Sequence, residues 1–332
     1  MEYRTLGRTG LNVSVFGIGS WQLSGALMID GQPDGFPDLG RESAIAIIKG
    51  CSDLGINLID TAEIYGDGEG EQRIGAAIKG QRDRWILSSK FGLRRGTQGE
   101  RVINCHPSTI RASLEGSLRR LNTDYLDIYL YHVPPQPEWI EAGQEVLDTL
   151  KQEGKIRFCG ISTDNYRELQ PLVKDNIVDV VNCARSLVNC PRPILSLVKA
   201  KNLGMINRGS LLAGQLSGKY FHNSPQLSPD DFRFPVKFNW SKYQFYEDLV
   251  PEGASMVGLS LRYLLDLDDT QTILLGGKSL THYREALKAL ELAPLDPKIH
   301  RAINRARYRQ SLERRAKNAV RPIITTLKKA FS

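Results

Sequence analysis

The chain has 332 residues, of which 41% are apolar and 24% charged, enough apolar material for either one large α/β barrel or two average domains. No stretch approaches the roughly 20 apolar residues of a membrane span, and the first residues lack the apolar segment of a secretory signal, so we expect no export. Five cysteines without close pairing predict reduced thiols and a cytoplasmic protein. The net charge of +7 is concentrated at the C-terminal end, so it says little about a substrate.

Strand-like runs and helical patterns alternate eight times along the chain. The strands are expected at Val13 to Ile18, Asn57 to Asp60, Trp85 to Phe91, Tyr125 to His132, Ile156 to Ser162, Val178 to Asn182, Gly204 to Asn207 and Thr272 to Leu275. The helices are expected at Glu42 to Leu54, Glu71 to Lys79, Ser108 to Leu121, Trp139 to Gln152, Tyr166 to Lys174, Arg192 to Lys201, Glu252 to Leu265 and Thr281 to Leu290. Eight alternations predict a (β/α)8 TIM barrel rather than a doubly wound sheet.

Two long connections interrupt this rhythm, at residues 21–39 and 209–249. Both follow strand-like runs, which places them at the face of the barrel where active sites lie. Connections this long in a compact domain are usually functional or disordered, so we interpret them as active-face loops.

Four polar residues stand at or just beyond the ends of three predicted strands: Asp60, Tyr65, Lys90 and His132. A phenol can donate a proton, and a nearby ammonium should help it to do so. We expect Asp60 to hold Lys90 in place and His132 to orient a substrate carbonyl. Taken singly, each residue has an ordinary structural explanation, such as a rim tyrosine or a helix-capping aspartate. Their joint placement favours a proton-transfer site.

The chain resembles the aldo-keto reductases, NAD(P)H-dependent barrel enzymes, over nearly its full length, and more closely their bacterial and channel β-subunit-like branch. The resemblance is carried by eight motifs in order: Leu6 to Leu11, Gly17 to Gly19, Asp60 to Ala62 with Tyr65-Gly66, Ser88 to Lys90, Leu126 to His132, Gly154 to Ser162, Gly214 to Tyr220 and Gly276 to Ser279. It implies reduction of a ketone, aldehyde or keto-sugar, with catalytic positions at Asp60, Tyr65, Lys90 and His132. The alternative that it also implies is a regulatory subunit that binds cofactor and a partner with little turnover.

The same resemblance implies a set of cofactor-binding residues: Gly19, Ser20, Trp21, Asp60, Ser162, Thr163, Asn182, Arg208, Gly209, Ser210, Leu211, Gly214, Leu216, Lys219, Lys278, Ser279, His282, Arg284 and Glu285. Lys278, Ser279 and Arg284 surround a helix start at the place where the family holds the adenosine 2′-phosphate, which indicates NADPH over NADH. A solvated, charged helix is the alternative explanation for these cations.

Four positions depart from the family pattern. Thr163 and Ala286 replace asparagine, Asn182 replaces glutamine, and Arg208 stands where many members stack an aromatic ring. Arg208 can stack on the nicotinamide, bind an anionic substrate, or form a structural ion pair, and the sequence leaves the three open.

Substrate specificity is expected from side chains at the mouth of the barrel: Trp21 and its loop, Phe91, Arg94, Arg95 and residues 238–243. The expected partner is a small carbonyl compound. The histidines and cysteines do not reach metal-ligand spacing, so no metal is expected. Nucleic acid is not expected either, because the basic tail carries only Tyr308 and Phe331 as stacking groups.

We divide the chain into a barrel at 1–294 and a basic helical C-terminal extension at 295–332. The extension carries eleven Lys and Arg against two acidic residues. Apolar residues between Val320 and Phe331 fall on one helical stripe beside the basic block 301–321. The favoured interpretation is a helix packed across the barrel with its basic face in water. The alternative is a peripheral contact with an anionic membrane or a protein.

Overall fold

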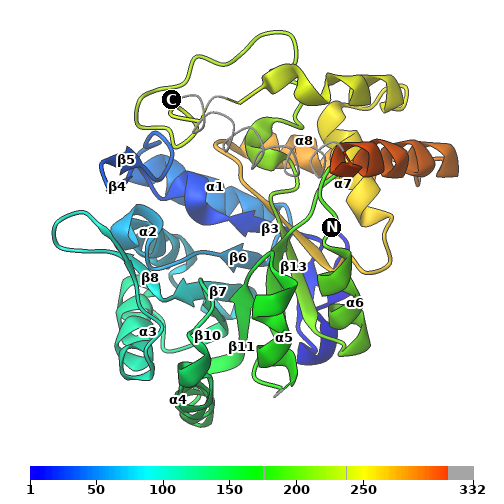
Figure 1. Ribbon diagram of the computed structural model, residues 1–332. Helices are drawn as coiled ribbons and strands as arrows, with labels where there is room; N and C mark the ends of the chain where they lie inside the picture. Colours follow the sequence, from blue (N-terminus) through cyan, green and yellow to red (C-terminus); the bar gives the residue numbers. More distant parts are fainter. Residues whose placement is uncertain (175, 237, 313–332) are drawn as a thin grey trace, which may run out of the picture.

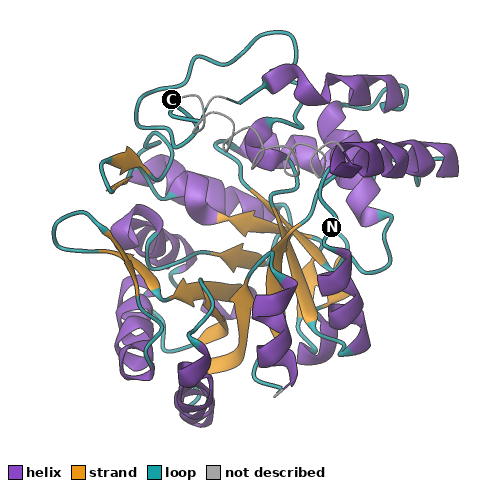
Figure 2. Cartoon of the chain, viewed as in Figure 1, coloured by secondary structure: helices purple, strands orange, loops and turns teal. Residues whose placement is uncertain are grey.

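Eight parallel strands form a closed barrel in the computed structural model, which describes residues 1–174, 176–236 and 238–312 (Figure 2). The strands close in the order β10-β11-β12-β13-β14-β3-β6-β7. Their bounds are β3 (Phe16–Gly19), β6 (Leu58–Asp60), β7 (Ile86–Phe91), β10 (Leu126–Tyr131), β11 (Ile156–Ser162), β12 (Val180–Ala184), β13 (Gly204–Arg208) and β14 (Thr272–Leu275). The predicted TIM barrel is confirmed.

A helix follows each barrel strand and packs on the outside of the barrel (Figure 1). The helices are α1 (Arg41–Asp53), α2 (Glu69–Ile78), α3 (Pro107–Leu121), α4 (Ile140–Gln152), α5 (Tyr166–Lys174), α6 (Arg192–Ala200), α7 (Met256–Leu265) and α8 (Leu280–Leu287). Each amphipathic helix buries its apolar stripe against the outward-facing side chains of the strands, which gives one continuous core layer. Across the described ranges, no helix is both long and apolar enough to cross a membrane.

The first predicted strand, Val13 to Ile18, is wrong as a single element. It divides at Val15 into β2 (Asn12–Ser14), which pairs antiparallel with β1 (Tyr3–Thr5), and the barrel strand β3. At the division the Val15 N–H donates to Glu2 and its carbonyl accepts from Ile273, so the chain passes from the hairpin to the barrel within one residue. The run Val13 to Ile18 contains a single polar residue, Ser14, which does not reveal such a change of partner.

The N-terminal hairpin plugs the bottom of the barrel. Leu6, Leu11 and Val13 pack against inward-facing barrel residues in a second buried cluster that includes Leu58 and Ile128. A barrel of eight strands is just wide enough for side chains to fill it, so the plug completes the core at the end away from the site.

Two further hairpins form part of the opposite rim: β4 (Met28–Ile29) with β5 (Gln32–Pro33), and β8 (Leu93–Arg95) with β9 (Arg101–Ile103). They are joined by the Asp30 N–H, which donates to the Gly99 carbonyl at 2.9 Å. The 209–249 loop, apart from residue 237, contains the 3₁₀ segments Leu212–Gly214 and Trp240–Leu249.

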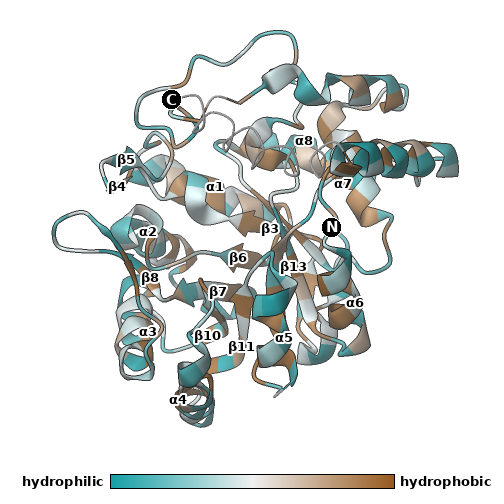
Figure 3. Ribbon diagram, viewed as in Figure 1, coloured by the Kyte–Doolittle hydropathy of each residue, from teal (hydrophilic) through white to brown (hydrophobic). Residues whose placement is uncertain are grey.

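Residues 297–312 form a helix that lies beside α7 and is strongly hydrophilic on its visible face (Figures 1 and 3). Ile303 is fully buried, whereas Arg301, Arg305 and Arg309 are exposed. This stretch packs on the barrel as the favoured interpretation expects. The apolar stripe between Val320 and Phe331 lies outside the described residues.

Replacing Leu6 by Ala should lower the free energy of unfolding by about 2–5 kcal/mol, because the cavity left in the plug cannot collapse onto rigid strands. Denaturant unfolding monitored by circular dichroism measures the change. Ile103→Ala is the matched control, since Ile103 is 63% exposed. A loss at Leu6 as small as that at Ile103 would contradict the plug.

Candidate active site

The barrel strands bring three of the four predicted catalytic residues together. Asp60 ends β6, Lys90 is the penultimate residue of β7, and His132 follows β10. Neighbouring strands place Asp60 opposite Ser88 and Lys90 opposite Leu130 in parallel register. Because side chains alternate along a strand, Ser88 and Lys90 lie on the same, inward face of β7.

Lys90 and Asp60 form a buried ion pair. The Lys90 Nζ atom donates to Asp60 Oδ2 at 2.5 Å and to the Thr61 carbonyl at 2.7 Å, and the two side chains are 1% and 4% exposed. The other carboxylate oxygen accepts from Ser88 at 2.9 Å and from Asn182 Nδ2 at 3.3 Å. Burial alone lowers the pKa of Lys90, but the charges of Asp60 and Tyr65 outweigh it, so the net pKa is raised and the ammonium stays charged.

Tyr65 points its hydroxyl at this ammonium. The Lys90 Nζ donates to Tyr65 Oη at 3.5 Å. The turn that begins at Tyr65 needs glycine next, because Gly66 has φ of 60° and a Cβ there would lie 1.9 Å from the Ser24 carbonyl oxygen. The close approach of Ser24 fixes the turn, and with it the direction of the phenol.

His132 completes the set. Its ring stands at 84° to the Tyr65 ring, with centroids 5.7 Å apart. Burial, and then the charges of Lys90, Arg208 and Arg101, hold the pKa of His132 well below its usual range. The imidazole is therefore neutral, and its Nδ1 atom has no hydrogen-bond partner within the described chain.

Asp60, Tyr65 and His132 line a pocket of about 660 Å³ at the mouth of the barrel. Its outer wall is an aromatic cluster from the two long loops: Trp21 lies 5.2 Å from Phe36 and 4.5 Å from Phe232, between ring centroids. The Phe232 N–H donates to the Gly35 carbonyl at 2.9 Å, so the loops meet directly. The prediction that both loops lie at the active face is confirmed.

The expected specificity residues are only partly in the pocket. Trp21 and Phe238 line it, whereas Phe91 does not: its ring stacks on Tyr129 and Tyr131 behind the barrel wall. Its neighbour Lys90 faces inward, so Phe91 must face outward. Arg94, Arg95 and Tyr243 do not line the pocket either.

The loop after Trp21, which was expected to set specificity, supplies Asp34 and Phe36 to the lining, whereas sequence reasoning missed Arg101 and Phe232. Arg101 pairs with Asp34 across the two hairpins of the rim. Arg101 begins the short rim strand β9, and Phe232 lies in the irregular part of the 209–249 loop; periodicity gives no signal at either position.

Seven of the expected cofactor-binding residues line this pocket: Gly19, Ser20, Trp21, Asp60, Ser162, Arg208 and Gly209. Asn182 lies directly behind them, fully buried, with its Oδ1 atom lacking a hydrogen-bond partner in the described ranges. A buried carbonyl acceptor beside Ser162 fits the amide of a nicotinamide ring. Thr163 lies outside the lining, because its hydroxyl donates to Glu168.

Arg208 lines the pocket but is tied to its wall. Its Nη2 atom lies 2.9 Å from Asp164 Oδ2, and Asp164 in turn accepts from the Ala184 N–H at 2.7 Å. Of the three alternatives for Arg208, the ion pair is the one present in this structure.

The segment after Arg208 has an unusual backbone. Leu212 and Ala213 both have positive φ, 50° and 54°, between the positive-φ glycines Gly209 and Gly214. Such strain, about 1–3 kcal/mol per residue, persists at functional sites, and consecutive left-handed residues turn backbone N–H groups toward one concave side. This fits the phosphate-binding segment expected between Gly209 and Lys219, in which Ser210 and Leu216 are buried and Leu211 is partly so.

Lys278, which lies between β14 and α8, is close to an acidic residue of the 209–249 loop. Its Nζ lies 3.8 Å from Asp231 Oδ2, and Asp231 also binds Arg233. Lys278 further lies 4.7 Å above the Phe36 ring, so it fastens the 209–249 loop to the 21–39 loop. Burial lowers the pKa of Lys278.

The remaining predicted phosphate-site residues gather around the start of α8. Ser279 occupies the N-cap position without a side-chain capping hydrogen bond, and His282 accepts the Lys278 N–H at 3.1 Å. Lys219 and Glu285 lie near His282, while Arg284 is exposed in the last turn of α8. A helix start surrounded by cations suits an anion.

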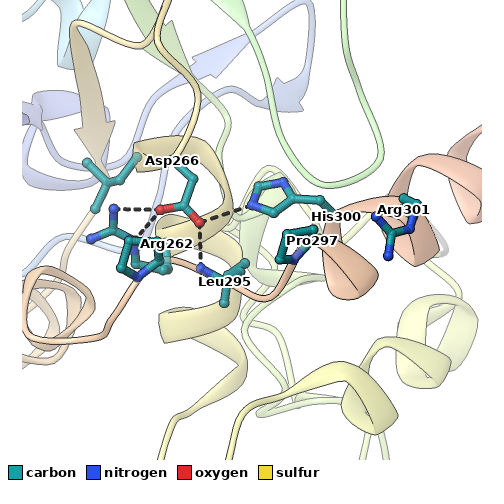
Figure 4. A pocket seen from close by; sticks show the side chains of 8 residues that line it. Arg262, Asp266, Leu295, Pro297, His300 and Arg301 are labelled. Atoms are coloured by element: carbon teal, nitrogen blue, oxygen red, sulfur yellow. Dashed lines mark hydrogen bonds and ion pairs between the residues drawn. The ribbon is translucent and has the colours of Figure 1, made fainter.

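A second hollow, of about 580 Å³, lies between α7 and the 297–312 helix (Figure 4). Asp266 stands at its centre and accepts from Arg262, the Leu295 N–H and His300 Nε2. Because Asp266 binds both Arg262 of α7 and His300 of the C-terminal helix, these contacts join that helix to the barrel. No cluster of potential metal ligands occurs in the part of the chain that the structure describes.

Comparison with known proteins gives the same picture. The profile of the Aldo/keto reductase family matches residues 16–307. The chain belongs to the aldo/keto reductase family. It is therefore an NAD(P)H-dependent oxidoreductase with a TIM barrel, in agreement with the arrangement of Asp60, Tyr65, Lys90 and His132.

Individual relatives have low sequence identity to this chain, but the matches cover most of both chains. The chain is 30% identical over 295 residues to aldo-keto reductase YhdN of Bacillus subtilis, covering 84% of this chain and 85% of that one. It is 28% identical over 322 residues to the NADH-specific methylglyoxal reductase of Escherichia coli, covering 88% and 94%. Aldo-keto reductase AKR11C1 from Bacillus halodurans (holo form) superposes with a TM-score of 0.77 at 27% identity, covering 92% and 96%.

Proposed function

We propose that the protein reduces the carbonyl of a ketone, aldehyde or keto-sugar with NADPH, and that Tyr65 donates the proton. The supporting observation is the position of the Tyr65 hydroxyl, 3.5 Å from an ammonium that Asp60 keeps charged. A phenolic O–H and a neutral imidazole therefore lie beside a pocket large enough for a substrate.

The residues divide the chemistry among them. A bound nicotinamide cofactor supplies hydride to the carbonyl carbon; Ser162 and Asn182 would hold its carboxamide. Tyr65 transfers its proton to the carbonyl oxygen, and the negative charge left on Tyr65 Oη is stabilised by the Lys90 ammonium. His132, being neutral, orients the carbonyl without competing as an acid.

Replacing Tyr65 by Phe should leave NADPH binding unchanged and reduce turnover by about 10²–10⁴-fold, because only the proton donor is lost. Steady-state turnover against a carbonyl panel, with NADPH binding followed by fluorescence, measures both. Tyr308→Phe is the control, since Tyr308 is 66% exposed on the C-terminal helix. Turnover within a few-fold of wild type would refute the role of Tyr65.

The preference for NADPH over NADH is also our proposal, since one relative is NADH-specific by name. It is supported by the cations around α8: Lys219 and Lys278 lie near His282 at the start of the helix, and Arg284 is exposed in its last turn. Lys278 also fastens the loop through Asp231, so its removal should weaken both cofactors.

Arg284→Ala should therefore be the selective change. We expect it to weaken NADPH binding about tenfold or more and to leave NADH binding unchanged, because only NADPH loses a charge-assisted hydrogen bond. Fluorescence titration with both cofactors measures this, with Lys288→Ala, one turn further along, as the control. Equal wild-type affinity for the two cofactors would contradict the phosphate site.

We also propose that the chain divides at residue 294 into a barrel and a C-terminal extension. The protein is further proposed to lie in the cytoplasm and to contact an anionic membrane or a protein through its basic tail. The cytoplasmic location is supported by the five free cysteines. A contact with an anionic surface is supported by the exposed arginines 301, 305 and 309, which share one face of the 297–312 helix with Tyr308 and Leu312.

If the tail binds membranes, full-length protein should co-sediment with anionic vesicles at low salt and less at high salt, because each basic residue adds about 1 kcal/mol that salt screens. A version ending at Arg315 should lose this binding. Absence of binding by the full-length protein at low salt would exclude the membrane contact.

A further inference from the structure

An ion pair in the pocket wall has no part in the chemistry proposed for Tyr65. Arg101 begins β9 and Asp34 directly follows β5, so the pair joins the two rim hairpins, and both residues line the pocket of about 660 Å³. Arg101 Nη2 donates to Asp34 Oδ2. The Arg101 side chain is 37% exposed and that of Asp34 22%, so a small molecule in the pocket can reach both.

The pair lies next to the apolar wall on which Tyr65 packs. Tyr65 contacts a buried cluster that includes Leu27 and Leu93, and all three residues line the pocket. The Asp34 N–H donates to the Leu27 carbonyl at 2.8 Å, which fixes Asp34 beside this cluster. A substrate whose carbonyl oxygen lies at Tyr65 can therefore extend along apolar side chains toward Asp34 and Arg101.

Each partner of the pair keeps one hydrogen-bonding atom free. Within the described ranges, Arg101 Nη1 donates to no acceptor and Asp34 Oδ1 accepts from no donor. The Arg101 N–H is bound elsewhere, to Asp30 Oδ1 at 3.0 Å. A hydroxyl group is both a donor and an acceptor. Two neighbouring hydroxyls therefore fit the pair, because one can donate to Asp34 Oδ1 while the other accepts from Arg101 Nη1.

The charges of the pocket wall disfavour an anionic substrate. The charged side chains of the lining all form ion pairs: Asp60 with Lys90, Arg208 with Asp164, and Arg101 with Asp34. Asp30 adds a second carboxylate 3.8 Å from Arg101 Nε, so this guanidinium lies between two carboxylates. A carboxylate or phosphate of a substrate would be repelled by both, whereas a hydroxyl group would not.

We propose that Arg101 and Asp34 form a subsite that binds the hydroxyl groups of an uncharged, polyhydroxylated aldehyde or ketone. The subsite selects such compounds over carbonyl compounds that lack hydroxyls or carry an acid group. The inference rests on the proposed reduction at Tyr65 and names its substrate class. Arg101 and Asp34 bind substrate and take no part in proton or hydride transfer.

The expected selectivity is moderate. A fully buried polar site rejects a substrate that leaves its groups unpaired by several orders of magnitude. Arg101 and Asp34 are partly exposed and bind each other, so a substrate without hydroxyls leaves neither of them unpaired. We therefore expect each charge-assisted hydrogen bond to change kcat/KM about tenfold, the lower end for such bonds.

The backbone of the rim does not depend on the pair. The Asp30 N–H donates to the Gly99 carbonyl at 2.9 Å, and the Arg101 N–H donates to Asp30. Arg95 Nε also donates to the Met28 carbonyl at 3.2 Å. These bonds remain when the side chain at position 34 or 101 is truncated, so the variants should keep the two hairpins joined.

Kinetics with paired aldehydes test the subsite. Glyceraldehyde and propanal have the same carbon chain and differ only in hydroxyl groups. The ratio of kcat/KM for glyceraldehyde to that for propanal should fall about tenfold from wild type to Arg101→Ala and to Asp34→Ala. Comparing this ratio between proteins cancels the different intrinsic reactivities of the two aldehydes.

Arg111→Ala is the matched control for this ratio. It also breaks a partly exposed ion pair, with Glu153 at 2.7 Å, but on the outside of the barrel, so it should keep the wild-type ratio. A wild-type ratio in Arg101→Ala or in Asp34→Ala would overturn the subsite.

Succinic semialdehyde and butanal test the charge preference in the same way, because they differ by one carboxylate. Wild type should have the lower kcat/KM for succinic semialdehyde. A wild-type preference for succinic semialdehyde would overturn the assignment to uncharged substrates. Loss of that preference in Arg101→Ala would show that Arg101 binds anions instead.

Binding without turnover separates the subsite from the proposed reduction. Saturation-transfer NMR on the protein saturated with NADP⁺, with xylitol as the probe, should give a saturable signal in wild type and Arg111→Ala and none in Arg101→Ala. If wild type reduces none of the aldehydes, the proposed reduction fails and this measurement alone decides the subsite. A missing signal in wild type, or an undiminished one in Arg101→Ala, would then overturn it.

Discussion

The buried pair of Lys90 and Asp60 is the interaction on which the active site depends. Two charges this far from water are costly unless every lone pair and proton is bound, and here Thr61, Ser88 and Asn182 supply the additional hydrogen bonds. The fixed ammonium has two effects at once. It faces the Tyr65 hydroxyl, and it helps to keep His132 neutral. One charge therefore assigns different roles to two neighbouring groups.

The alternation of side chains along β7 separates the chemistry into two layers. Ser88 and Lys90 face inward, where both bind Asp60. Ser89 and Phe91 face outward into the space that α2 and α3 cover. The same strand therefore borders both the pocket and, one residue further along, the buried Glu71 carboxylate that Ser89 and Arg120 bind.

The mouth of the pocket is bordered by two loops that ion pairs between side chains hold in place. Buried Arg73 of α2 binds Asp38 and the Leu23 carbonyl, which anchors the loop that carries Trp21. On the opposite side, Asp231 binds Arg233 and approaches Lys278, which fastens the longer loop. The two loops then meet through aromatic rings. A pocket built in this way depends on charges at positions that periodicity does not reveal, such as Asp34, Asp38 and Arg101.

The sequence by itself determined the barrel and the strand-end residues of the tetrad, because alternating apolar periods and polar strand ends are local signals. It could not separate β2 from β3 within Val13 to Ile18, since the division at Val15 is set by hydrogen bonds to Glu2 and Ile273. It also could not show that Arg208 pairs with Asp164, that Phe91 faces away from the pocket, or that Ser89 donates to Glu71. These features depend on which segments meet in space, and only the closed barrel brings α2, α3 and the catalytic loop together around one buried volume.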